Sequence, residues 1–174
     1  MKSAALIGIN HADQYPRHKD DRSDLFCKFV KQQAISLAVD FIAEEMSREV
    51  LVRKKVYLSS VEIAAWSICV RHRLCDPDSA ERKALGIPSY DELMEARGIS
   101  LYSISEMEEK LLEADERLYW PIREKEWLDR IQGANHRSLL FILGAQHVES
   151  FARLLEQAQY HVNDISPQWA RQLT

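Results

Sequence analysis

The sequence predicts an α/β fold: a single domain with a mostly parallel sheet and helices on both faces. Apolar runs typical of buried strands alternate along the chain with segments of helical periodicity. The length of 174 residues suits one domain with a sizeable core. A composition of 46% hydrophobic and 29% charged residues, with only 5 Gly and 5 Pro, leaves little room for disorder. We therefore expect residues 1–174 to form one α/β domain.

The first third of the chain predicts two strands separated by a long loop and a helix. Residues 3–9 are apolar and form the first expected strand, and the polar loop over residues 10–24 is long enough to be functional. Apolar residues at helical spacing predict a helix over about 23–37. The apolar run 37–43 predicts a second strand, which ends in Glu44 and Glu45.

The middle of the chain predicts helices around one short strand. An amphipathic pattern favours a helix over 59–71, followed by a strand over 72–75 and a turn at Asp76-Pro77-Asp78. Asp76 and Asp78 follow a strand, so they are also candidates to add a carboxylate to the same edge. Residues 79–85 predict a short helix, and 86–102 a loop with another short helix.

The last third predicts two long helices and the remaining strands. Ser103 and Glu106 have the spacing of a capping box, which begins a helical stretch that Pro121 should break or kink. A turn over 133–136, a strand over 138–143, a helix over 148–158 and a strand near 160–164 complete the alternation.

Charge and composition exclude several classes of protein. The formal net charge of −4 argues against nucleic-acid binding, which usually needs a basic surface. No apolar stretch approaches the roughly 18 residues of a membrane span, and the amino terminus lacks a signal peptide pattern, so we expect a cytoplasmic protein. The three cysteines lack C-x-x-C spacing and are expected to be reduced thiols, with Cys75 a nucleophile only if a histidine lies beside it.

One short pattern occurs twice, each time at the end of a predicted strand. Gly8-Ile9-Asn10-His11 follows the first apolar run, and Gly144-Ala145-Gln146-His147 follows the run 138–143. Glycine permits a tight exit from a buried strand, and the carboxyl ends of parallel strands meet at one edge of the sheet. The repeated GxxH pattern therefore predicts two imidazoles at one site.

An acidic pair ends the second predicted strand at the same edge. Because adjacent strand residues face opposite ways, only one of Glu44 and Glu45 is expected to share a site with the histidines, unless the strand has already ended.

The two GxxH motifs, the pair Glu44 and Glu45, and Arg123 within Ile122-Arg123-Glu124 occur in an order that resembles one superfamily. It contains the erythromycin esterases, the ChaN-like haem-binding proteins, the TraB family and the Tiki metalloproteases. The resemblance implies a hydrolase of ester, amide or peptide bonds, acting on a small molecule or a peptide, with His11, Glu44, Glu45, Arg123 and His147 as catalytic residues.

Two chemical schemes fit these residues. His11, Glu44 (or Glu45) and His147 could hold a divalent metal ion such as Zn, Mn or Co, which would activate a water molecule. Without metal, a glutamate or histidine accepts a proton from water while another group protonates the leaving group, and Arg123 binds developing negative charge. Each residue also has a structural alternative: loop stabilisation for the histidines, and salt bridges for the other three.

Two other functions remain open. The ChaN-like relatives imply a non-catalytic ligand-binding or sensor protein, for which haem is the candidate cofactor. The tryptophan-rich segment 119–127 is compatible with an interaction protein or a homo-oligomer assembled through its helices.

Overall fold

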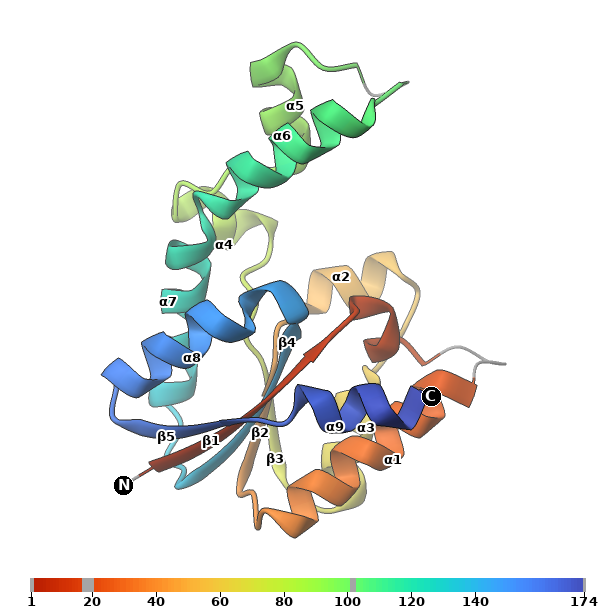
Figure 1. Cartoon of the computed structure of the whole chain (residues 1–174), viewed down its shortest axis with the longest axis vertical. Coiled ribbons are helices and arrows are strands. Elements are labelled where there is room, and N and C mark those ends of the chain that lie inside the picture. Colours follow the sequence, from red (N-terminus) through yellow and green to blue (C-terminus); the bar gives the residue numbers. More distant parts are fainter. Residues whose placement is uncertain (1, 17–20, 101–102, 174) are drawn as a thin grey trace.

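The computed structural model describes residues 2–16, 21–100 and 103–173 and shows an α/β fold around one sheet. Its described strands are β1 (Lys2–Ile9), β2 (Phe41–Glu44), β3 (Arg71–Leu74), β4 (Ser138–Gly144) and β5 (Tyr160–Asp164). They lie in the order β3-β2-β4-β1-β5, and every neighbouring pair is parallel (Figure 1). This confirms the predicted fold class.

One face of the sheet is covered by α1 (Asp21–Ser36), α3 (Ser60–Ser67) and α9 (Ser166–Ala170). Ile7 and Ile42 from the strands pack there with Phe26, Val61 and Trp169 from the three helices. Each of these side chains is almost fully buried, so this layer forms one hydrophobic core.

The other face is covered by α7 (Trp120–Gln132) and α8 (Val148–Gln157). Leu6 and Ala43 from the strands contact Trp127, Phe151 and Leu155 on this side. Because side chains alternate along a strand, Ala43 faces α7 and α8 while its neighbour Ile42 faces α1 and α3. Strands buried on both sides explain the continuous apolar runs of the sequence.

The pairing of β1 with β4 brings the two GxxH motifs together. Ile9 lies opposite Gly144, and each strand leads directly into a short 3-10 helix, η1 (His11–Gln14) or η2 (Ala145–His147). A Cβ atom on Gly8 would lie 2.5 Å from Val148 Cγ2 and 3.0 Å from the Ala145 backbone. Glycine at position 8 therefore allows β1 to approach the start of α8 closely.

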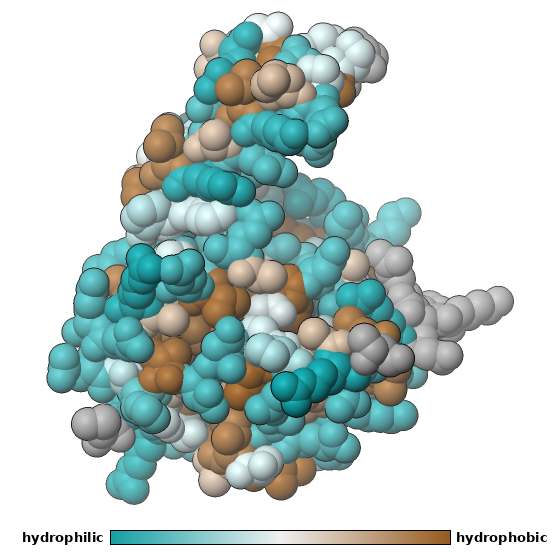
Figure 2. Space-filling model, in the orientation of Figure 1, coloured by the Kyte–Doolittle hydropathy of each residue, from teal (hydrophilic) through white to brown (hydrophobic). Residues whose placement is uncertain are grey.

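The remaining helices lie beyond the carboxyl edge of the sheet. They are α2 (Arg48–Arg53), α4 (Ser79–Ala84), α5 (Tyr90–Arg97) and α6 (Glu106–Arg117). The last two form an arm that projects from the rest of the molecule, and a recess separates the arm from the body on one side (Figures 1 and 2). The arm has a small core of Leu93, Met94 and Leu112.

Three predicted boundaries are wrong, each for a local reason. The strand expected over 37–43 begins only at Phe41, because residues 37–40 form the turn after α1, with Ala38 at a φ of 49°. The helix expected over 59–71 ends at Ser67, and Cys69 at a φ of 56° reverses the chain before β3. The capping box is formed by Ser105 with Glu108 rather than by Ser103 with Glu106.

The expected break at Pro121 is confirmed. Pro121 marks the break between α6 and α7 and lies in the first turn of α7, where its missing N–H costs no helical hydrogen bond. Residues 17–20 of the predicted loop and 101–102 of the predicted loop and helix lie outside the described residues. Among the helices described, none combines the length and the apolar character that crossing a membrane requires.

Candidate functional site

A cavity of about 570 Å³ opens at the carboxyl edge of the sheet, beside both GxxH motifs. Four of the five predicted site residues line it: His11, Glu45, Arg123 and His147. The other lining residues are Ile9, Asn10, Arg82, Glu116, Trp120, Gly144, Ala145 and Gln146. The structure thus places both histidines, one glutamate and the arginine around one space.

Glu45 lies at the centre of this cluster and is almost fully buried. Its Oε1 accepts a hydrogen bond from Arg123 Nη2 at 2.8 Å, and its Oε2 accepts one from the Gly144 backbone N–H at 2.7 Å. The Nε2 atoms of His11 and His147 each lie 3.7 Å from the same Oε1. The two imidazoles therefore converge on one carboxylate oxygen.

The two histidines are held by different partners. His11 Nδ1 is 2.8 Å from Gln14 Oε1, and its side chain is 44% exposed. His147 Nδ1 is 2.8 Å from Glu124 Oε1, and only 6% of its side chain is exposed. The ring of Trp120 packs over His147 with centroids 4.2 Å apart. His147 is thus the enclosed member of the pair, and His11 is the one that solvent reaches.

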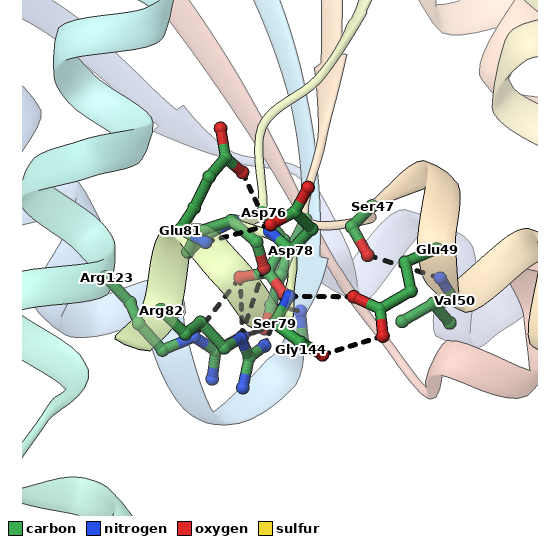
Figure 3. Close-up of polar contacts among 12 residues, drawn as sticks. Ser47, Glu49, Val50, Asp76, Asp78, Ser79, Glu81, Arg82, Arg123 and Gly144 are labelled. Atoms are coloured by element: carbon green, nitrogen blue, oxygen red, sulfur yellow. Dashed lines mark hydrogen bonds and ion pairs between the residues drawn. The ribbon is translucent and has the colours of Figure 1, made fainter. Parts of the chain in front are cut away.

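Arg123 is fixed by a buried carboxylate from the predicted turn, Asp76. Asp76 Oδ1 accepts from Arg123 Nη2 at 2.8 Å and from Trp127 Nε1 at 3.1 Å, while its Oδ2 accepts from Arg82 Nη2 at 2.5 Å. Figure 3 shows both guanidinium groups pointing toward Asp76. Burial alone would raise the pKa of Asp76, but the charges of Arg123 and Arg82 hold that pKa below its usual range.

The rim of the cavity is tied to the neighbouring helix α2. Ser79, at the start of α4, donates to Glu49 of α2 from its backbone N–H and from its hydroxyl, each at 2.7 Å (Figure 3). Arg82 follows one turn later on α4, so this anchor helps to place its guanidinium between Asp76 and the cavity.

Glu44 does not join the histidines, which corrects the predicted metal set of His11, Glu44 and His147. Its carboxylate points to the opposite face of the sheet, where it is bonded by Ser59 Oγ, by His72 Nε2 at 2.9 Å and by Gln14 Nε2 at 2.7 Å. The reason is that side chains alternate along a strand. Glu44 points to the same face of the sheet as Ile42, and Glu45 points to the same face as Ala43.

Cys75 has no role as a nucleophile in this arrangement. It packs in the core beneath α7, and burial raises the pKa of its thiol to about 12. None of the described residues that line the cavity is a serine, threonine or cysteine.

Two residues that hold the histidines, Gln14 and Glu124, escaped the sequence-based prediction. Gln14 lies three residues after His11 within the loop that the GxxH motif begins, and Glu124 directly follows the predicted Arg123. A search for an acceptor near each imidazole along the chain would have found Gln14. Nothing in the spacing of Glu124 and His147 indicates their contact.

No protein-family model matches the chain, and no curated protein and no solved structure matches it significantly.

Proposed function

We propose that the protein is a hydrolase that activates a water molecule against an ester, amide or peptide bond of a small molecule or peptide. The observation that carries this proposal is the convergence of His11 Nε2 and His147 Nε2 on Glu45 Oε1, at 3.7 Å each, inside a cavity. Two imidazoles with their Nδ1 atoms engaged leave two Nε2 atoms for proton transfer at one place.

His147 is the proposed general base. Glu124 accepts the Nδ1 hydrogen bond and orients the ring, as a carboxylate does for the base of a catalytic triad. In the proposed step, Nε2 removes a proton from water while the water oxygen bonds to the carbonyl carbon. The π electrons of the carbonyl move to its oxygen, which becomes an oxyanion.

His11 and Arg123 have complementary proposed roles. His11, which solvent reaches, takes up a proton from solvent and donates it from Nε2 to the leaving group. The electron pair of the oxyanion re-forms the carbonyl as the carbon to leaving-group bond breaks, and His147 afterwards releases its proton to solvent. Arg123 keeps its charge, because Asp76 and Glu45 raise its pKa although burial lowers it, and this charge faces the oxyanion. The proposed nucleophile is water, because no described residue that lines the cavity carries an aliphatic hydroxyl or a thiol.

The donor types at this site also suit a divalent metal ion such as Zn, Mn or Co. His11, His147 and Glu45 would hold it, and both Nδ1 atoms already have the acceptors that orient metal-binding histidines. Such an ion would supply hydroxide near neutral pH. As arranged, no group of three or more His, Cys, Asp or Glu among the described residues forms a metal site, and Arg123 already binds Glu45 Oε1.

The test is a panel of ester and peptide substrates assayed with the wild type and with a His11→Ala, His147→Ala double variant. We expect hydrolysis by the wild type and at least a 100-fold loss in the double variant. His161→Ala, which changes an exposed histidine of β5, is the matched control and should retain activity. Metal analysis, with chelation and re-addition of Zn, Mn or Co, distinguishes the two schemes.

Wild-type rates in the double variant would refute the proposal. The alternative, ligand binding without turnover, predicts no hydrolysis of any substrate together with a haem Soret band that disappears in the same double variant.

A further inference from the structure

We propose that Glu44 is a positioning residue that acts through Gln14 to keep the proton of His11 on Nδ1, leaving Nε2 free to face Glu45. This claim concerns the tautomer of His11. It gives Glu44 a part in the proposed hydrolysis, but it holds whether or not the protein hydrolyses a substrate.

The first step is the environment of Glu44, which is fully buried. Its Oε1 receives hydrogen bonds from Ser59 Oγ and His72 Nε2, and its Oε2 receives one from Gln14 Nε2 at 2.7 Å. Ser59 Oγ and Gln14 Nε2 are the donors of their bonds, so both carboxylate oxygens of Glu44 act as acceptors. A buried carboxylate needs these hydrogen bonds, because an unpaired polar group would be costly.

The second step is the direction of the Gln14 amide, which is also fully buried. Since the amide donates to Glu44 from its NH2 group, it turns its oxygen toward His11. That oxygen lies 2.8 Å from His11 Nδ1. A carbonyl oxygen accepts only, so Nδ1 must carry the proton.

The third step is the effect of the Nδ1 proton on Nε2, the atom of His11 that faces Glu45. With the proton on Nδ1, neutral His11 presents a lone pair on Nε2, 3.7 Å from Glu45 Oε1. On His147 the same arrangement is made directly by Glu124. Glu44 and Glu124 thus fix the two imidazoles from opposite faces of the sheet, one through an amide and the other by contact.

Replacing Glu44 by glutamine keeps the shape of the side chain but no longer requires the NH2 group of Gln14 to point toward position 44. A neutral amide can donate as well as accept, so the side chain of Gln14 can reverse and offer its NH2 to His11. The proton of His11 then moves to Nε2 in a part of the molecules.

The experiment is ¹⁵N NMR of the histidine rings in the full chain at about pH 8, where an ordinary imidazole is neutral. His11→Gln assigns the signals of His11. We expect the Nδ1–H tautomer in the wild type and a shift toward Nε2–H in Glu44→Gln. Glu45→Gln should leave the proton of His11 on Nδ1, because the bonds from Glu44 to Gln14 and from Gln14 to His11 do not include Glu45. Glu124→Gln should change the signals of His147 and leave those of His11 as they were.

A wild-type His11 protonated on Nε2 would overturn the inference, as would an unchanged tautomer in Glu44→Gln. If Glu44→Gln does not fold, Gln14→Met, which removes the acceptor, should abolish the Nδ1–H preference. If the wild type proves inactive, the proposed function fails while the tautomer result stands. If it is active, Glu44→Gln should lower kcat about 10- to 100-fold and leave KM nearly constant.

Discussion

Replacing Gly144 by alanine tests whether the space above Glu45 matters to the site. An added Cβ would lie 3.0 Å from His11 Nε2 and 3.3 Å from Glu45 Oε2. The backbone at this position, with φ −58° and ψ 136°, suits alanine, so the change introduces no backbone strain. Its effect is therefore confined to the two side chains that the new methyl group touches.

The expected magnitudes for activity and stability differ. Restricting the unfolded chain stabilises the variant by about 0.4–1 kcal/mol, while tighter packing costs about 1–3 kcal/mol, so the net loss of unfolding free energy stays within about 2.5 kcal/mol. To relieve the contacts, His11 or the Glu45 carboxylate must move by a few tenths of an ångström. A misplacement of about 1 Å costs roughly 100-fold in rate, so a movement of a few tenths of an ångström should lower kcat/KM about 3- to 10-fold.

Urea unfolding and hydrolysis kinetics measure the two effects on the same samples. The control is Gly133→Ala at the end of α7, where the nearest atoms to the new Cβ lie at 3.5 and 3.7 Å. It should keep full activity and have unchanged or slightly higher stability. A folded Gly144→Ala variant with wild-type kcat/KM would show that the placement of His11 and Glu45 does not limit the reaction.

Three further outcomes are expected. Asp76→Asn, which removes one of the two buried carboxylates that Arg123 contacts, should lower the unfolding free energy by about 3 kcal/mol at pH 7. Because the pKa of Asp76 is lowered in the folded state, the stabilisation from its carboxylate is present above the unfolded value near pH 4 and is lost as pH falls through the folded pKa. Urea titrations measure the difference in unfolding free energy between the wild type and Asp76→Asn. A difference that stays constant from pH 7 down to pH 2 would contradict this account. A thiol reagent at pH 8 should label exposed Cys69 rapidly and buried Cys75 only after unfolding, and fast native labelling of Cys75 by mass spectrometry would argue against its burial. Burial lowers the pKa of His136, so the stabilisation from its neutral side chain is present above about pH 6.5 and lost as pH falls through the folded pKa. The unfolding free energy of the wild type should therefore fall more steeply between pH 7.5 and 5 than that of His136→Gln. Equal slopes for the two proteins would contradict the lowered pKa of His136.

The fold was predictable from the sequence where burial leaves a clear pattern. The strands expected over 3–9 and 138–143 match β1 and β4 closely, because central parallel strands are apolar on both faces. The strand expected near 160–164 matches β5, which lies at an edge of the sheet. Apolarity alone failed at residues 37–40, which continue the apolar run but form a turn. Two overlapping S-x-x-E spacings made the start of α6 ambiguous, and only the chain's path beyond it selects Ser105.

The sequence predicted which strand-end residues belong to the candidate site, but it did not predict all of the contacts that hold them. The GxxH motifs and Arg123 lie where the parallel topology places them. The sequence left open which of Glu44 and Glu45 faces the histidines, because that depends on where β2 ends and which face each residue meets. The contact of Glu124 with His147 depends on how α7 packs on the sheet, which no local spacing encodes.

The pairing of β1 with β4 has a consequence for the order of folding. β1 lies between β4 and β5, and both of these strands come much later in the sequence, so β1 is synthesised long before either of its neighbours. Contacts this distant in sequence form slowly, since a long loop must close before they stabilise the chain. His11 and His147 can meet only when that final pairing is complete. Partly folded forms of this protein therefore contain no assembled site, and any reaction it catalyses begins only once β1 has paired with β4.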